Sequence, residues 1–236
     1  MNSDIAIVTG ASRGIGRAIA IGFAKDGAKV ALFGRDSEKL EETKRLVEKV
    51  GSEAIIFTGD VADESFVTSS VDEVVSKFGR VDHLVNNAGT AVFKKLVDSS
   101  LDEFKSQIDA NLIGVYNFSK AVAKKLIEQK SGSIINIASL AGKNGFANGT
   151  MYTATKHAVL GFTKSLMMEL REYNIRVASI CPGSVRTDLI MDTFMEPKNV
   201  DTLLAPEDIA WTVMSIIKLP PRALISDIDI RPANKQ

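Results

Sequence analysis

The sequence predicts an α/β fold in which a doubly wound parallel sheet of about seven strands carries helices on both faces. Short apolar runs alternate with longer segments of helical periodicity along the whole chain. The apolar runs are continuous, which is typical of parallel strands buried on both faces. A glycine-rich turn follows the first run and opens a helix. No repeat, linker or composition break divides the chain, so residues 1–236 are expected to form one domain.

The composition matches a soluble globular protein and excludes several function classes. Lys plus Arg equals Asp plus Glu at 29 each, so no net field favours nucleic acid or an anionic membrane. No apolar run could span a bilayer, and no secretory leader is visible. The single cysteine, Cys181, suits a reducing compartment, and we expect a cytoplasmic location. His83, His157 and that thiol lack ligand-like spacing, so we expect no metal site.

The first strand, residues 4–9, leads directly into a turn of the form G-x-x-x-G-x-G and then a helix to about residue 25. Glycines allow a tight turn and a close approach of the backbone to a pyrophosphate, and the helix N-terminus offers free N–H groups. We therefore predict a dinucleotide site. Its first contacts are expected at Gly10, Ser12, Arg13, Gly14, Ile15 and Gly16.

The end of the second strand, residues 28–33, bears on the choice of cofactor. An acidic residue there would accept hydrogen bonds from the ribose of NAD, whereas an arginine can hold the extra phosphate of NADP. The strand is followed by Gly34 and Arg35, and Arg13 could approach the same phosphate. Asp36 could favour NAD, although it also looks like the N-cap of the charged helix over residues 37–50. We expect NADP(H) to be favoured over NAD(H).

Two further strand ends are predicted to border the same site. The strand over residues 53–58 is followed by Asp60 and Val61, and Asp60 could receive the adenine amino group or cap the next helix, which runs to about residue 78. The strand at residues 82–85 is followed by Asn86 to Gly89. Structural and cofactor-binding roles both stay open for Asn87 and Gly89.

A tyrosine and a lysine four residues apart form the centre of the predicted chemistry. Tyr152 and Lys156 share one side of a long helix. A cation about 4 Å from a phenol contributes roughly 4 kcal/mol at an effective dielectric of about 20, so Lys156 is expected to lower the pKa of Tyr152. Ser139 ends a buried strand, residues 134–138, at the edge where open α/β sheets bind ligands. Asn111 interrupts the apolar face of a helix over residues 101–128, where it needs a partner.

The C-terminal part completes the sheet. A strand over residues 174–180 leads into a turn that ends at Thr187, and residues 188–204 have no clear period. Apolar side chains on an irregular segment beside the site suggest a substrate lid, although a packed surface loop is the alternative. A helix over residues 206–219 and a strand over residues 223–230 follow.

With these residues in place, the chain resembles a classical short-chain dehydrogenase/reductase over nearly its whole length. The motifs are TGASRGIG at Thr9–Gly16, Asp60, NNAG at Asn86–Gly89, Asn111, Ser139, YTATK at Tyr152–Lys156 and PGSVRT at Pro182–Thr187. The resemblance implies a single-domain Rossmann fold, hydride transfer with a nicotinamide cofactor, and a homodimer or homotetramer joined partly through the helices containing Asn111 and Lys156.

The resemblance also implies a role for each catalytic residue. Tyr152 would be the general acid or base, and Ser139 would hydrogen-bond the substrate oxygen. Lys156 would hold the nicotinamide ribose and lower the phenol pKa, and Asn111 would hold a water linking Lys156 to solvent. Cofactor contacts are implied at Asp60, Asn87, Gly89, Val185 and Thr187.

Three functions follow as alternatives. The first is an NADP-dependent carbonyl reductase or alcohol dehydrogenase acting on a small, partly apolar molecule. The second is a 3-oxoacyl-[acyl-carrier-protein] reductase, although the C-terminal sequence LISDIDIRPANKQ lacks the paired glycines common in that group. The third is a protein that senses NADP or acts as a scaffold without turnover, since a fold alone does not fix activity.

Overall fold

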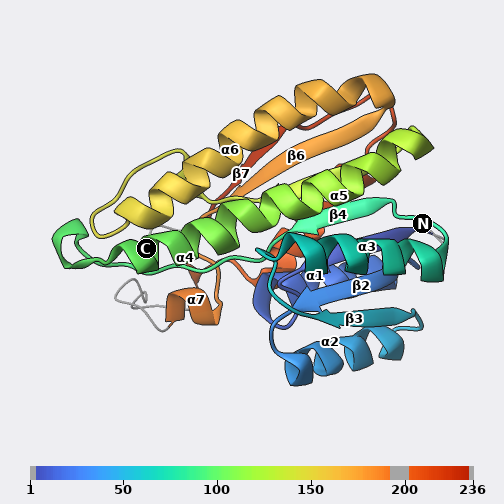
Figure 1. Cartoon of the computed structure of the whole chain (residues 1–236), viewed down its shortest axis with the longest axis horizontal. Coiled ribbons are helices and arrows are strands. Elements are labelled where there is room, and N and C mark those ends of the chain that lie inside the picture. Colours follow the sequence, from blue (N-terminus) through green and yellow to red (C-terminus); the bar gives the residue numbers. More distant parts are fainter. Residues whose placement is uncertain (1–3, 192–201, 234–236) are drawn as a thin grey trace.

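The computed structural model describes residues 4–191 and 202–233. Within these residues seven strands form one parallel sheet in the order β3-β2-β1-β4-β5-β6-β7 (Figure 1). The strands are β1 Ile5–Thr9, β2 Lys29–Gly34, β3 Ala54–Thr58, β4 His83–Asn86, β5 Gly132–Ile137, β6 Ile175–Pro182 and β7 Asp227–Ile230. The predicted doubly wound α/β sheet is therefore confirmed.

Helices cover both faces of the sheet, because the central strands are apolar on both sides. The helices are α1 Gly14–Lys25, α2 Ser37–Lys49, α3 Glu64–Phe78, α4 Leu101–Ile108, α5 Gly114–Gln129, α6 Thr150–Leu170, α7 Asp188–Met191 and α8 Pro206–Ile217. One core layer joins α1, α2 and α8 to the sheet through side chains such as Phe23, Leu40 and Val213. The opposite layer joins α3, α5 and the end of α6 through Val71 and Phe118, and α5 and α6 run along this face in Figure 1.

The strand order reverses between β1 and β4, and this reversal places the ligand site. The chain proceeds from β1 outward to β3, returns to β4 beside β1, and then continues outward to β7. In open α/β sheets the crevice at such a reversal, beyond the carboxyl ends of the strands, binds ligands. The loops after β1, β4 and β5 all reach this crevice.

The structure corrects two sequence predictions. The helix predicted over residues 101–128 is divided into α4 and α5 by a turn of π-helix at Asp109–Ile113 (η2). The last strand is shorter than predicted and pairs with β6 only from Asp227 to Ile230. Of the predicted lid, residues 192–201 lie outside the described residues. Its described parts are α7 and the segment at Leu204, which bridges to Val185.

No helix in the described ranges combines the length and the apolar composition that a membrane span requires.

Candidate active site

The glycine turn lies between the end of β1 and the start of α1. Gly14 has a φ of 54°, and a Cβ there would lie 3.1 Å from Thr187 Cγ2, so glycine suits both the backbone and the approach of Thr187. A Cβ on Gly16 would lie 2.2 Å from the Gly10 oxygen, so α1 packs directly against the turn. The first turn of α1 has no acidic residue and no side-chain cap. Its N–H groups are therefore open to an anionic ligand, as the sequence predicted.

The loop after β4 holds this turn in place. Thr9 Oγ1 accepts hydrogen bonds from the backbone N–H groups of Asn87 and Ala88, both at 2.9 Å. Asn87 Nδ2 donates to the carbonyl oxygens of Thr9 at 3.0 Å and Gly10 at 3.2 Å. Of the two roles left open for Asn87, the structural one is therefore present, and its side chain also lines the cleft described next.

One continuous cavity of about 1140 Å³ joins the predicted cofactor site to the predicted catalytic residues. All but one of the predicted site residues line it: Gly10, Ser12, Arg13, Gly14, Ile15, Arg35, Asp60, Val61, Asn87, Gly89, Asn111, Ser139, Tyr152, Lys156, Val185 and Thr187. Gly16 is the exception, because it packs against Gly10. The sheet reversal therefore gathers residues that are far apart in the sequence around one cleft.

The Ser139 hydroxyl and the Tyr152 phenol meet inside this cleft. Ser139 follows β5, its Oγ accepts a hydrogen bond from the Ala141 N–H at 3.1 Å, and its hydroxyl is near enough to the Tyr152 phenol to lower the phenol pKa. Lys156 lies one turn further along α6. Its Nζ donates to the Ile137 carbonyl at 3.0 Å and lies 5.7 Å from the centre of the Tyr152 ring. The three side chains thus converge at the end of β5.

Asn111 is buried in the π-helical turn and connects two other parts of the site. Its Nδ2 donates to the Thr90 carbonyl at 2.9 Å and to Thr155 Oγ1 at 3.0 Å, and its Oδ1 accepts from the Thr90 N–H at 2.8 Å. Thr155 in turn donates to the Tyr152 carbonyl at 2.8 Å. Thr90 and Thr155 therefore supply the partners that the apolar helix face lacks, and Asn111 ties the loop after β4 to α6.

The sequence from the first strand to the segment after β6 matches one protein family. A family description named short chain dehydrogenase matches residues 4–198. The chain belongs to the short-chain dehydrogenase family. It is 35% identical to an uncharacterized oxidoreductase of Staphylococcus saprophyticus, with 98% of both chains covered. It is 36% identical to a 3-oxoacyl-[acyl-carrier-protein] reductase of Synechocystis, with 96% of this chain and 94% of that protein covered.

Solved structures of short-chain dehydrogenases have the same fold. A metagenomic short-chain oxidoreductase in complex with NADP superposes with a TM-score of 0.88 at 36% identity, with 99% of both chains covered. A short-chain dehydrogenase of Mycobacterium paratuberculosis bound to NAD has a TM-score of 0.88 at 31% identity, covering 97% of this chain and 96% of that one. This protein is accordingly an oxidoreductase of the short-chain dehydrogenase family, and its structural neighbours include complexes with both cofactors.

In this short-chain dehydrogenase, burial has the largest effect on the pKa of Tyr152. Burial raises the pKa of the Tyr152 phenol to about 12, and its hydrogen bond to Ser139 opposes that rise. Burial also lowers the pKa of Lys156 to about 8. Neither of the two causes at Tyr152 involves Lys156, so the sequence prediction that Lys156 lowers the phenol pKa stays a prediction. The lysine Nζ lies 5.7 Å from the centre of the Tyr152 ring and donates to the Ile137 carbonyl.

The pKa of Lys156 gives a testable pH dependence. A lysine whose pKa falls to about 8 on folding binds fewer protons than in the unfolded chain above that pH, so folding becomes more favourable as the pH rises from 8 toward 10.5. Relative to Lys156→Met, the wild-type protein should therefore gain free energy of unfolding over this range. Urea unfolding at several pH values measures the difference, with the exposed Lys49→Met as control. A difference between wild type and Lys156→Met that stays constant with pH would contradict the lowered pKa.

The sequence analysis did not identify two aromatic residues that lie beside Tyr152. The Phe93 ring lies 5.4 Å from the Tyr152 ring at 79°, and the Phe146 ring lies 5.7 Å from that of Phe93. Both phenylalanines line the cavity from loops. A single phenylalanine in a loop carries no periodic signal, so nothing in the local sequence indicates this aromatic wall.

Arg13 has a partner that the sequence did not predict. Its Nη1 lies 2.6 Å from Asp188 Oδ2 at the start of α7, and both side chains are more than half exposed. An exposed ion pair of this kind is worth about 0–1 kcal/mol. Asp188 therefore links the glycine turn to α7 weakly, and a stronger anionic ligand could displace it.

Proposed function

We propose that this protein is an NADP-dependent oxidoreductase that transfers hydride between nicotinamide and a carbonyl or alcohol substrate, with Tyr152 as general acid or base. The observation that carries the proposal is the convergence of Ser139, Tyr152 and Lys156 inside the cleft that the glycine turn opens. When bound, the cofactor supplies the hydride chemistry. The chain supplies the proton and the hydrogen bonds that hold the reacting oxygen.

Each of the four polar residues has a distinct part in this proposal. Tyr152 exchanges a proton with the substrate oxygen, and the Ser139 hydroxyl donates a hydrogen bond to that oxygen as negative charge develops. Lys156, at the floor of the cleft, holds the nicotinamide ribose. Asn111 fixes the loop after β4 against α6. The phenol holds its proton at neutral pH, as a general acid in carbonyl reduction must.

Arg35 supports NADP as the cofactor. It is exposed, follows β2 and lines the cleft, and among the described residues no carboxylate pairs with it. Asp36, the residue that could have favoured NAD, accepts a hydrogen bond from the Lys39 N–H at 3.1 Å and caps α2. That bond lowers the pKa of Asp36. The acid is thus engaged in capping, while the guanidinium of Arg35 is available for a phosphate.

Replacement of Arg35 by alanine tests this preference. The variant should bind NADPH about 10-fold to 100-fold more weakly, because a charge-assisted hydrogen bond contributes about 1.5–3 kcal/mol. Its affinity for NADH should not change, since NADH lacks the phosphate. Fluorescence titration with both cofactors measures the ratio, and Arg45→Ala on the exposed face of α2 is the matched control. Equal wild-type affinities for NADPH and NADH would refute the preference.

The side chains at the substrate end of the cleft support a partly apolar carbonyl compound as the substrate. Phe93, Phe146, Leu140 and Pro232 line it together with the Tyr152 ring. A screen of aldehydes and ketones that follows NADPH absorbance tests the proposed function directly. The screen includes 3-oxoacyl thioesters, because the Synechocystis relative is named a 3-oxoacyl-[acyl-carrier-protein] reductase. Turnover of the thioesters alone would favour that alternative.

The third alternative, a protein that binds NADP without turnover, predicts a different result. Such a protein would bind the cofactor and reduce none of these compounds. The presence of Asn111, Ser139, Tyr152 and Lys156 in one cleft supports catalysis over this alternative.

We also propose self-association as a homodimer or homotetramer, partly through the helices near Asn111 and Lys156. Exposed apolar side chains on this part of the molecule support it, among them Ile113, Tyr116 and Met168. The cytoplasmic location expected from the single cysteine stays a prediction.

A further inference from the structure

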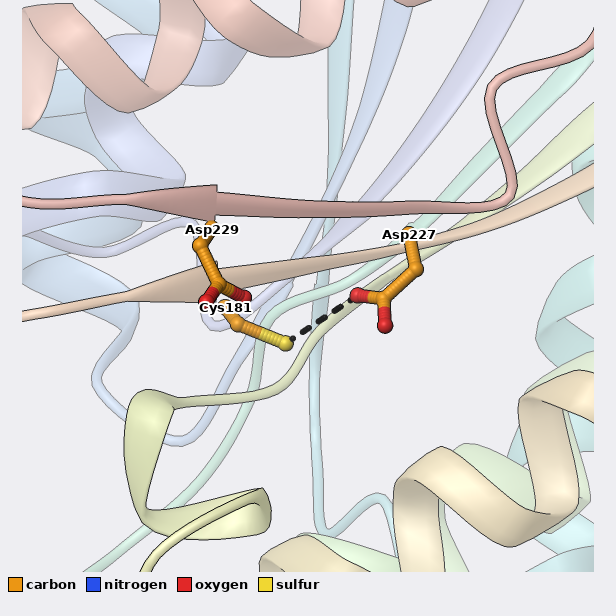
Figure 2. Close-up of side chains that lie close together, drawn as sticks. All are labelled: Cys181, Asp227 and Asp229. Carbon is orange, nitrogen blue, oxygen red and sulfur yellow. Dashed lines mark hydrogen bonds between the residues drawn. The ribbon is translucent and has the colours of Figure 1, made fainter.

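The side chain of Lys143 lies between two carboxylates of the edge strand β7. Its Nζ is 2.8 Å from Asp227 Oδ2 and 2.5 Å from Asp229 Oδ1. Asp229 also pairs with Arg231 at 3.2 Å. Figure 2 shows the side chains of Asp227 and Asp229 extending from β7 toward Cys181 on β6. Two positive side chains thus balance two negative ones at this edge of the sheet.

This cluster already holds a cation that belongs to the chain. The ligand atoms of Cys181, Asp227 and Asp229 lie within 4.8 Å of one another, which is the spacing of a metal site. The Lys143 ammonium, however, contacts both carboxylates. Burial raises the pKa of the Cys181 thiol to about 12, so the thiol keeps its proton and donates to Asp227 Oδ1 at 3.4 Å. The cluster is therefore a binding site for Lys143.

Lys143 also ends the turn that carries Ser139. The N–H of Gly142 donates to the Ser139 carbonyl at 2.9 Å, and the N–H groups of Lys143 and Asn144 both donate to the Leu140 carbonyl at 3.0 Å. A Cβ on Gly142 would lie 2.8 Å from the Lys156 carbonyl, so the turn is pressed against α6. One side of the turn is thus fixed by packing on α6, and Lys143 ties its other side to β7.

We propose that Lys143 is a positioning residue, which holds the Ser139 turn against the edge strand β7 and so keeps the Ser139 hydroxyl on the Tyr152 phenol. The catalytic part of this inference rests on the function proposed above. The ion pairs suit the task, because the side chains of Lys143, Asp227 and Asp229 are only 26–34% exposed and form a network. Such a network restrains geometry more strongly than an isolated surface pair does.

Three variants test whether Lys143 holds the Ser139 turn in place or only neutralises the charge of Asp227 and Asp229. Lys143→Met removes the tether and leaves the two carboxylates, Lys143→Arg keeps both functions, and Lys143→Met with Asp227→Asn removes one of those carboxylates without restoring the tether. Lys49→Met is the control for the loss of an exposed lysine. For each variant we measure the hydrogen exchange of the amides of residues 142–144, the free energy of unfolding, the NADPH affinity, kcat and KM.

In Lys143→Met we expect the amide hydrogens of residues 142–144 to exchange about 10-fold faster, because the turn opens more often. We also expect kcat to fall about 10-fold, because small displacements of a positioned group reduce rates strongly. NADPH affinity should not change, and Lys143→Arg should restore most of both losses. The double variant should regain stability but not kcat or slow exchange. If it regains all three, the lysine only neutralises charge and the inference is wrong.

The exchange measurement keeps this inference distinct from the proposed function. The exchange rates of the amides of residues 142–144 show whether Lys143 restrains the turn, and they can be measured even if no tested carbonyl compound is reduced. Failure of the proposed activity therefore does not affect this test. If these amides exchanged in Lys143→Met at the wild-type rate, Lys143 would not restrain the turn and the inference would be wrong, whatever the activity of the protein.

Discussion

Tyr152→Phe is expected to lower kcat for carbonyl reduction by about 10²-fold to 10⁴-fold, the usual contribution of a positioned general acid. The change removes the phenol oxygen and keeps the ring that packs 5.4 Å from Phe93. The walls of the cleft should therefore persist, and NADPH affinity should change little. Stopped-flow or steady-state reduction followed by NADPH absorbance measures kcat, and fluorescence titration measures the affinity.

Tyr116→Phe is the matched control for this prediction. Tyr116 lies on α5 with 43% of its surface exposed, and its phenol does not line the cleft. Its removal should leave kcat unchanged. If Tyr152→Phe retained wild-type turnover, the proton would have to come from another group and the proposed mechanism would be wrong.

The sheet and the cofactor turn could be predicted because their signals are local. A strand buried on both faces is a run of apolar residues, and the strands predicted at residues 4–9, 28–33 and 53–58 agree with β1, β2 and β3 to within about one residue. Gly10 and Gly14 adopt positive φ angles in the turn, a conformation that the sequence indicates by the residue type itself.

The predicted site residues were found for a different reason. Asn111 interrupts an apolar helix face, Ser139 follows an apolar strand, and Tyr152 and Lys156 lie four residues apart on one side of a helix. The parallel sheet brings the ends of its strands to one edge, so residues after different strands converge. The family resemblance supplied their individual roles.

Other features depend on tertiary contacts that no local pattern reveals. The helical period continues through Asn111, so the π-helical turn is not visible in the sequence. The pKa of Tyr152 depends mainly on burial, which spacing along α6 does not fix. Lys143 meets Asp229 across 86 residues, at the edge of a sheet whose last strand was predicted to be longer.

Ser139→Ala is expected to lower kcat by about 10²-fold to 10³-fold, as removal of one donor to a developing oxyanion does in other enzymes. The variant also loses the acceptor for the Ala141 N–H and leaves the buried Tyr152 phenol without its serine partner. An unpaired buried polar group costs about 1–3 kcal/mol, so the free energy of unfolding should fall as well. Ser139→Thr keeps the hydroxyl and should retain more activity than Ser139→Ala. The control is Ser131→Ala, which removes an exposed hydroxyl.

A double-mutant cycle tests whether Ser139 and Tyr152 act as one unit. If the serine works by holding the substrate oxygen that receives the tyrosine proton, it has little left to do once the proton donor is gone. Ser139→Ala combined with Tyr152→Phe should then be about as slow as Tyr152→Phe alone, because losses of groups that act together are not additive. Additive losses would mean that the two hydroxyls work on separate steps. Because both variants keep the backbone of the turn and of α6, a non-additive result can be assigned to the hydrogen-bonded pair itself.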